Sequence, residues 1–250
     1  MKIYKDIYYK DNQDIRNALD IYLPEDEVQE VFVFFHGGGM LFGDKLDVDH
    51  FVNELIDEHI ALVSCNYHFI DETPFPRPLF DAVDAVAWVM NNIQKYTDCK
   101  NIYVGGQSCG GYLSQMICFD TKLLKERGIN PLDIKGYFFD AGQPTTHYNV
   151  LKYSGIDERR VIIDERAPLF YVGLEEKYPD MLFIVADNDM LNRFEQTKLM
   201  ISAMKTYELD MSKVELKIIP NSTHCSYTKN ICEDGFPFYA RLIIDFIKKR

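Results

Sequence analysis

A serine between glycines is the feature of this sequence that points most directly to chemistry. The run Gly106-Gln107-Ser108-Cys109-Gly110 matches the G-x-S-x-G pattern, in which a sharp turn from a strand into a helix exposes a serine hydroxyl as a nucleophile. The glycines serve a steric purpose, because such a serine has a strained backbone and only small residues two positions away let strand and helix pass. The alternative interpretation is an ordinary glycine-rich turn.

A second glycine-rich motif, His36-Gly37-Gly38-Gly39, lies upstream of the serine. It directly follows the continuous apolar run Val31–Phe35, so we expect it at the carboxyl end of a buried strand. Glycines leave backbone amides uncovered, and such donors can stabilise the oxyanion that forms during acyl transfer. A phosphate-binding loop is the alternative, but it would need the pattern G-x-x-x-x-G-K-[ST], which this sequence lacks.

A serine nucleophile needs a histidine base and a carboxylate that orients the base. The chain order expected for this strand–turn–helix architecture is serine, acid, histidine. Asp187 and Asp189 follow the apolar run Met181–Ala186, and His224, the last histidine of the chain, follows the run Val214–Ile219. Since one helix and one strand separate the two positions, both should lie at neighbouring strand ends. The residues alone leave Asp187 and Asp189 as competing acids.

The elements that must position these residues alternate along the chain. Strand-like apolar runs are Ile3–Tyr9, Asn17–Leu23, Val31–Phe35, Ala61–Cys65, Ile102–Val104, Ile134–Phe139, Met181–Ala186 and Val214–Ile219. Helices are predicted around 79–90, from Gly111 onward, and over Phe194–Tyr207 and Phe238–Ile247. This alternation predicts an α/β fold with a mostly parallel central sheet and helices on both faces. Sites in such sheets gather at the carboxyl ends of the strands.

We expect one domain over residues 1–250. Only the stretch 143–180 breaks the alternation of strands and helices, because it is polar and irregular. Loops of this length are usually either functional or disordered. The stretch is therefore predicted to be a small lid or a wall of the substrate pocket, with an ordinary connection containing a short helix as the equal alternative.

Composition narrows the partners and the setting. The chain has 250 residues, is 47% hydrophobic and carries a net charge of −12, which disfavours nucleic acid and anionic membrane surfaces as partners. No apolar run approaches the roughly 20 residues that span a bilayer. Six cysteines without a C-x-x-C pair, together with an N-terminus that has no apolar leader, predict reduced thiols and a cytoplasmic protein. No cofactor is expected, and the oligomeric state is unknown.

An acidic stretch containing Asp44, Asp47, Asp49 and His50 superficially suggests a metal site. A solvated helix start explains it better, because aspartate is enriched in the first turns of helices. The sequence therefore predicts no metal site there.

The motifs together resemble the α/β-hydrolase superfamily, in its branch of small H-G-G-G carboxylesterases akin to hormone-sensitive lipase. Leu19-Asp20-Ile21-Tyr22-Leu23-Pro24 resembles the D-x-Y-x-P opening of that family. Gly106–Leu113 resembles its G-x-S-A-G-G-x-L elbow, and the helix around Trp88 resembles the segment before the elbow. The resemblance implies the α/β-hydrolase fold. It also implies an open acyl pocket, since the long N-terminal cap of larger members is missing.

The resemblance further implies catalytic roles. Ser108 would be the nucleophile and His224 the general base. The acid would be Asp189, because the family places its aspartate just before a small residue or proline and a leucine, as in Asp189-Met190-Leu191. Asp187 remains the nearby competitor.

The oxyanion hole that the resemblance implies consists of the amides of Gly38, Gly39 and Cys109, with Gly37 as a further candidate. Cys109 stands where the family usually has alanine, although its amide can still donate. Met40 stands where an aromatic residue often follows the glycines, which puts the shape of the substrate pocket in doubt.

Cys109 and Cys225 each directly follow a predicted catalytic residue. Oxidation of either thiol would then block the site. The favoured alternative is that both are small residues that fill space.

These features predict a serine hydrolase that cleaves short-acyl esters of small molecules through a Ser-His-Asp triad and a covalent acyl-enzyme. Arylformamidases, which share a similar H-G-G-x-W loop, are an alternative, although Met40 in place of tryptophan argues against them. Carbohydrate or feruloyl esterases are another. A non-catalytic binding protein of the same fold is the alternative outside enzymes, but such proteins typically lose the nucleophile or the histidine.

Overall fold

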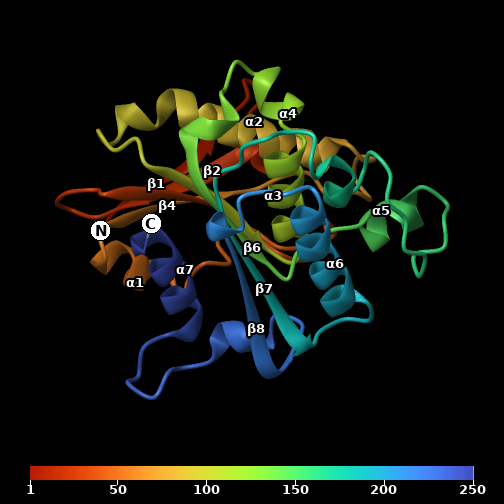
Figure 1. Ribbon diagram of the computed structural model, residues 1–250. Helices are drawn as coiled ribbons and strands as arrows, with labels where there is room; N and C mark the ends of the chain where they lie inside the picture. Colours follow the sequence, from red (N-terminus) through yellow and green to blue (C-terminus); the bar gives the residue numbers. More distant parts are fainter. Residues whose placement is uncertain (250) are drawn as a thin grey trace.

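The computed structural model describes residues 1–249, and its eight strands form one sheet (Figure 1). The order in the sheet is β1-β2-β4-β3-β5-β6-β7-β8. β1 and β2 are antiparallel at one edge, and β4, β3 and β5 to β8 run parallel. The strands are β1 (Lys2–Tyr8), β2 (Ala18–Leu23), β3 (Glu30–Phe35), β4 (Ile60–Cys65), β5 (Ile102–Gln107), β6 (Ile134–Asp140), β7 (Asp180–Asn188) and β8 (Val214–Thr223).

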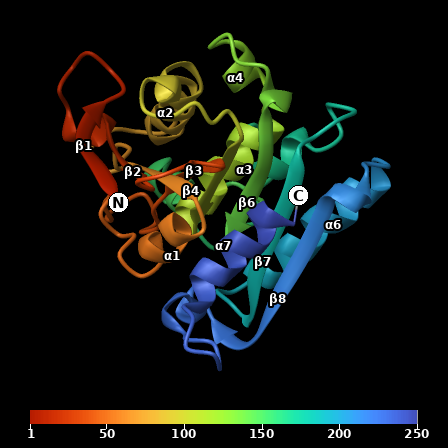
Figure 2. The ribbon, with the colours of Figure 1, turned by 90° about the vertical axis from the view of Figure 1, so that its left-hand side faces the viewer.

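Helices cover both faces of this sheet, which explains why the central strands are apolar on both sides. The helices are α1 (Val52–Asp57), α2 (Arg77–Asn92), α3 (Cys109–Phe119), α4 (Lys122–Lys125), α5 (Tyr148–Tyr153), α6 (Arg193–Thr206) and α7 (Phe238–Lys248). The apolar sides of α2, α3 and α6 share one core cluster, and those of α1 and α7 share the other. Figure 2 shows α1 and α7 side by side on their face of the sheet. The predicted α/β-hydrolase fold is confirmed.

Three differences from the sequence prediction lie near the carboxyl ends of the strands. β8 was expected to end at 219 but continues to Thr223; Pro220 is tolerated because β8 is the edge strand. Helix α3 begins at Cys109 and not at Gly111, because Ser108 alone makes the turn from β5. The acidic stretch 44–50 consists of turns, and α1 starts only at Val52.

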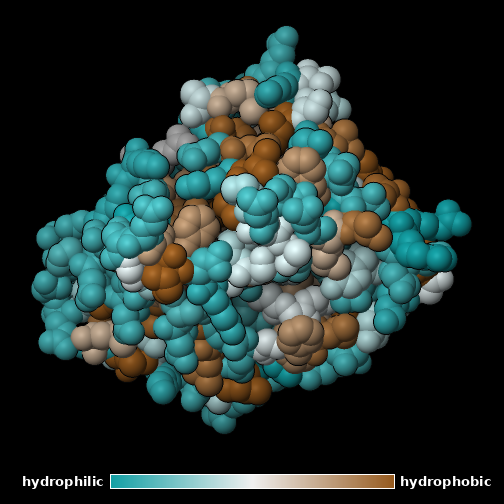
Figure 3. All heavy atoms as spheres, turned by 90° about the horizontal axis from the view of Figure 1, so that it is seen from below, coloured by the Kyte–Doolittle hydropathy of each residue, from teal (hydrophilic) through white to brown (hydrophobic). Residues whose placement is uncertain are grey.

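The parallel strands end at the same edge of the sheet, and the chemistry-bearing residues follow those ends. The H-G-G-G segment follows β3 and Ser108 follows β5. Asp189 follows β7 and His224 follows β8. In Figure 1, β7 and β8 run downward toward this edge, and Figure 3 views the molecule from below. Within residues 1–249, no helix has both the length and the apolar character needed to cross a bilayer.

Candidate active site

Ser108 occupies the strained position between β5 and α3. Its backbone has φ 55° and ψ −115°, a conformation that residues other than glycine rarely adopt. The flanking glycines are required by close packing. A Cβ on Gly110 would lie 2.1 Å from the Phe35 carbonyl oxygen, and one on Gly106 would lie 2.5 Å from the Gly110 carbonyl carbon. The sequence thus makes a sharp elbow that holds the serine hydroxyl away from both elements.

A chain of hydrogen bonds connects this serine to a histidine and a carboxylate. The Ser108 Oγ lies 2.8 Å from His224 Nε2, and His224 Nδ1 lies 2.6 Å from Asp189 Oδ1. The Asp189 side chain has no exposed surface, whereas the His224 side chain is 23% exposed. The carboxylate is therefore shielded, while the imidazole and the serine remain reachable from solvent.

The environment of Asp189 favours its charged form. Burial raises the pKa of this carboxyl, but the hydrogen bond from His224, the charge of that imidazole, the Met190 amide and the charge of Arg193 together hold the pKa below its usual range. Arg193 is itself buried and donates to the Ala141 carbonyl and to Gln143 Oε1. An ionised carboxylate at this point accepts a hydrogen bond from the Nδ1–H group, which leaves Nε2 free to accept the proton of the serine hydroxyl.

The competing acid, Asp187, binds backbone instead. Its two oxygens accept the amides of Asn221 at 2.8 Å and Ser222 at 3.1 Å. These bonds lower the pKa of the exposed Asp187 carboxyl. Asp187 therefore fastens the end of β7 to the segment of β8 that leads to His224, while Asp189 contacts the imidazole.

The H-G-G-G segment passes close to the serine. A Cβ on Gly37 would lie 3.5 Å from the Ser108 Cβ. Gly38 and Gly39 have φ values of +109° and +65°, and a Cβ on Gly38 would collide with the Phe42 carbonyl oxygen at 1.9 Å. Cys109 is the first residue of α3, so its amide has no acceptor within the helix. Gly37 and Cys109 thus lie beside the nucleophile, and Gly38 and Gly39 continue the segment from Gly37.

Met40 and Cys109 are buried, and Cys225, the residue after His224, is partly buried. The Met40 side chain lies in the core and leaves the pocket wall to other residues. All six cysteines are free thiols. Burial raises the pKa of the Cys109 and Cys225 thiols. Thiols held in the protonated form react slowly, which favours the interpretation that both are structural.

Asp140 is a buried acid near the site that sequence reasoning missed. Its backbone carbonyl accepts the Ser108 amide at 2.7 Å, and its carboxylate accepts the Tyr227 hydroxyl. Burial raises the pKa of Asp140 to about 6, while the hydrogen bond from Tyr227 acts in the opposite direction. The available signal was its position directly after the apolar run of β6, at the edge where sites gather.

Two clefts flank the catalytic residues. One, of about 450 Å³, is lined by Gly37, Gly38 and Gln107 together with charged residues, among them Asp49 and Lys229. The other, of about 380 Å³, is lined by residues of the 143–180 stretch and of the loop after β7: Gln143, Tyr148, Glu158, Arg159, Arg160, Val161, Met190, Leu191, Asn192, Arg193 and Gln196. Near the centre of the face in Figure 3, pale residues of intermediate hydropathy lie between hydrophilic and hydrophobic side chains.

The acidic stretch makes local bonds. Asp44 Oδ1 accepts the Leu46 amide at 3.0 Å, and Asp47 Oδ2 accepts the Asp44 amide at 2.9 Å. Over residues 1–249, no cluster of three or more His, Cys, Asp or Glu side chains is arranged to hold a metal ion. These aspartates therefore stabilise turns.

The sheet order, the strand–helix elbow and the loops at the strand ends define the class of α/β-hydrolases. Comparison with known proteins agrees. The model of the prolyl oligopeptidase family matches residues 76–241, and the BD-FAE model matches residues 19–130. Since the first match spans more than half of the sequence, the chain belongs to the prolyl oligopeptidase family.

Relatives and solved structures are esterases. An isoprenylcysteine alpha-carbonyl methylesterase of Arabidopsis thaliana is 30% identical over 158 residues, which covers 60% of this chain and 36% of the relative. The chain spans about a third of the length of the first curated relatives it matches. A truncated carbohydrate esterase from gut microbiota matches with a TM-score of 0.78 and 18% identity, covering 100% of this chain and 96% of that chain.

Esterase B of Lactobacillus rhamnosis has a TM-score of 0.77 and 15% identity, covering 99% of this chain and 86% of that chain. At these identities the solved structures establish the fold alone. The predicted resemblance to carboxylesterases of the α/β-hydrolase superfamily is confirmed.

Proposed function

We propose that this chain is a serine hydrolase that cleaves short-acyl carboxylic esters of small molecules. The observation that carries the proposal is the hydrogen-bonded series from Ser108 Oγ through His224 to Asp189, placed at a strained elbow. The esterase names of the relatives agree with it. The predicted cytoplasmic location and the lid role of 143–180 stay predictions.

The proposed mechanism has two acyl transfers. Ser108 Oγ attacks the ester carbonyl while His224 Nε2 takes the hydroxyl proton, and Asp189 stabilises the imidazolium that forms. Collapse of the tetrahedral intermediate breaks the bond to the leaving alcohol, which takes the proton from Nε2. Water then attacks the acyl-enzyme with His224 again as base, and release of the carboxylic acid restores Ser108.

The proposed oxyanion hole consists of the amides of Gly38, Gly39 and Cys109. Removing one such donor typically lowers kcat by on the order of 10²–10³. The packing of Gly37, the residue before these glycines, against Ser108 supports this assignment. A Cβ at position 38 or 39 would lie 1.9 Å or 2.9 Å from a neighbouring atom, so both positions favour glycine.

A short acyl group fits the crowding on one side of this loop. A Cβ on Gly39 would lie 2.9 Å from both the Tyr148 hydroxyl and Asn149 Nδ2, the latter of which donates to the Gly39 carbonyl. The start of α5 thus closes the loop on that side. A long chain would have to leave along the cleft bounded by Tyr148 and Met190.

A carbohydrate ester is the second candidate, because charged side chains line part of the other cleft. Asp47, Asp49, His50 and Lys229 line it beside the glycine loop, and such groups hydrogen-bond to hydroxyls of a leaving alcohol. The arylformamidase and feruloyl esterase alternatives have no comparable observation in their favour. A non-catalytic binding role leaves the strained serine and its histidine unexplained.

Hydrolysis of a p-nitrophenyl ester series from acetyl to decanoyl tests the proposal, with an acetylated saccharide and N-formylkynurenine in parallel and Ser108→Ala as the blank. Serine-dependent turnover that peaks at short chains supports the short-acyl esterase. A preference for the acetylated saccharide selects the second candidate. Formamide cleavage without ester cleavage, or turnover that survives Ser108→Ala, contradicts the proposal.

A further inference from the structure

The side chain of Cys109 joins the elbow to the H-G-G-G segment. Its sulfur accepts the Met40 amide at 3.1 Å and lies 3.3 Å from the Tyr67 hydroxyl. That hydroxyl donates its one proton to the His36 carbonyl at 2.8 Å. The thiol can donate its own proton to the tyrosine oxygen or to the His36 carbonyl, which lies 3.9 Å from the sulfur. We call these contacts of Cys109 with Met40, Tyr67 and His36 the Cys109 latch.

The latch lies in a fully packed environment. Cys109, Met40 and Tyr67 have no exposed surface, and His36 has almost none. The His36 ring stacks on the Tyr67 ring, with centroids 4.4 Å apart and an angle of 16° between the planes. Burial raises the pKa of the Cys109 thiol, although its contacts with the Tyr67 hydroxyl and the Met40 amide act in the opposite direction. The group keeps its proton and can act as donor and acceptor together.

The segment that the latch holds has little stiffness of its own. Residues 37–39 are all glycine, and glycine resists backbone rotation least. The latch fixes this segment at both ends, through the His36 carbonyl and the Met40 amide. The direction of the amides in the segment therefore depends on where the sulfur lies.

We propose that the Cys109 thiol is a positioning residue that holds the amides of Gly38 and Gly39 where the oxyanion forms. The inference rests on the proposed function, since it assigns a task within that reaction. The task belongs to the side chain and is separate from the proposed donor role of the Cys109 amide. Alanine, which has no thiol, cannot perform it.

The first test is Cys109→Ala, with Cys118→Ala as the matched control. Cys118 lies on the same helix, is 2% exposed, and its sulfur contacts Met181 Sδ at 3.9 Å, away from the glycine segment. Cys109→Ala should lower kcat about tenfold to a hundredfold, because the hole is loosened but keeps its donors. KM should stay within about twofold, since the loss falls on the transition state.

A trifluoromethyl ketone separates this task from a general loss of structure. Its adduct with Ser108 places an oxyanion in the hole, so its inhibition constant should rise in parallel with the loss of kcat/KM in Cys109→Ala. Cys118→Ala should change neither quantity by more than about twofold. Cys109→Ser, which keeps a donor and an acceptor, should recover part of the lost activity. A kcat of Cys109→Ala within twofold of wild type overturns the proposal.

A second variant and a second readout cover the remaining outcomes. If Cys109→Ala fails to fold, Tyr67→Phe removes only a hydroxyl and should lower kcat about threefold to tenfold; an unchanged kcat overturns the proposal. Amide exchange of Met40 should be faster in Cys109→Ala but not in Cys118→Ala, and equal exchange overturns the latch. If the wild-type protein has no hydrolase activity, the proposed function is wrong. The exchange rate of the Met40 amide would then still test whether the Cys109 latch exists.

Discussion

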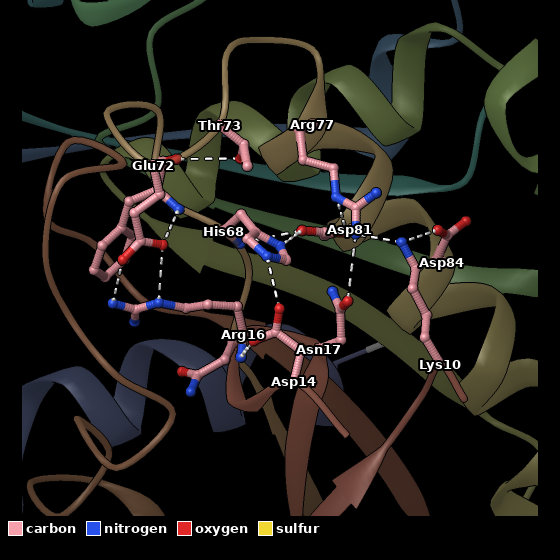
Figure 4. Close-up of polar contacts among 12 residues, drawn as sticks. Lys10, Asp14, Arg16, Asn17, His68, Glu72, Thr73, Arg77, Asp81 and Asp84 are labelled. Carbon is pink, nitrogen blue, oxygen red and sulfur yellow. Dashed lines mark hydrogen bonds and ion pairs between the residues drawn. The ribbon is translucent and has the colours of Figure 1, made fainter. Parts of the chain in front are cut away.

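His68 and His224 each bind an aspartate through Nδ1, but only His224 presents its other ring nitrogen to a serine. His68 Nδ1 lies 2.5 Å from Asp81 Oδ2, which is close to the 2.6 Å separation at the active site. Its Nε2 lies 3.0 Å from Asp14 Oδ2, so a second carboxylate occupies the place that the serine hydroxyl has beside His224 (Figure 4). The same pair of side chains therefore serves two purposes in one molecule.

The surroundings of His68 form an ion-pair network. The unexposed Asp81 side chain also pairs with Lys10 Nζ at 2.8 Å and with Arg77 Nε at 3.0 Å, and Lys10 reaches Asp84 at 2.6 Å. Burial raises the pKa of Asp81, but the hydrogen bonds from Lys10 and His68 hold it below its usual range. This network fastens the N-terminal hairpin to α2.

The comparison of His68 with His224 shows which feature of a histidine–aspartate pair indicates catalysis. Both ring nitrogens of His68 face acceptors, so the ring satisfies both only by carrying two protons. His224 donates from Nδ1 alone, and its Nε2 can accept the proton of Ser108. The partner of Nε2 therefore distinguishes His224, the proposed base, from His68, which belongs to an ion pair.

Exchanging each histidine for alanine gives the largest contrast. His224→Ala should lower kcat by on the order of 10⁴ or more, because it removes the base and the acid of both acyl transfers. His68→Ala should keep ester turnover within about threefold under conditions where it is folded. Steady-state kinetics on a short-chain p-nitrophenyl ester measure both. Comparable losses in the two variants would contradict the distinction.

The two aspartates after β7 give the next contrast. Asp189→Asn should lower kcat by on the order of 10⁴, because an amide in place of the carboxylate favours the wrong imidazole tautomer. Asp187→Asn should cost less than about tenfold, since it weakens only bonds to backbone amides. The same ester assay decides, with circular dichroism to confirm folding. A larger loss in Asp187→Asn would identify that residue as the acid.

The sequence could predict the sheet because its central strands are buried on both faces and read as apolar runs. The short helices α1, α4 and α5 have no such signal, because four to six residues cannot display helical periodicity. The extension of β8 through Pro220 was missed because proline usually ends a strand. That it is an edge strand is a fact of tertiary structure.

The site was predictable where it rests on local motifs and chain order, as for Ser108 and His224. The choice between Asp187 and Asp189 was not settled by residue type, because the two lie two positions apart near a register shift of β7 against β8. Which carboxylate turns toward the imidazole depends on that shift. Asp140 escaped notice because its partner Tyr227 lies 87 residues away.

Stability should respond to the network around His68 more than to other surface pairs. His68→Ala leaves the buried Asp81 carboxylate with fewer partners, so the free energy of unfolding should fall by about 2–4 kcal/mol. His59→Ala is the matched control, since His59 pairs with an exposed Asp26 at 3.4 Å, and it should cost less than about 0.5 kcal/mol. Urea denaturation at constant pH measures both. Equal losses of unfolding free energy in the two variants would show that the network around His68 does not stabilise the protein.

The smallest expected effect is the contribution of Asp140 to stability. Asp140 is a second carboxyl near His224, and its charge bears on the comparison of His224 with His68. Burial raises its pKa to about 6 against the hydrogen bond from Tyr227, whereas an unfolded aspartate has a pKa of about 3.9. The native state therefore binds more protons between these values. The stability that Asp140 contributes is complete below about pH 4 and is lost as the pH rises through about 6.

Asp140→Asn removes that titration, so the unfolding free energy of wild type relative to the variant should fall by about 2–3 kcal/mol from pH 4 to pH 7. Urea unfolding across this range measures the difference. Asp164→Asn is a control of opposite sign: burial raises the pKa of Asp164, but the Arg166 and Thr146 bonds hold it below normal, so the wild-type advantage should grow with pH. A pH-independent difference for Asp140→Asn would mean that this carboxyl is ionised throughout. His224, like His68, would then lie near two carboxylate charges, those of Asp189 and Asp140. The difference between the two histidines would then be the contact of His224 with Ser108 alone.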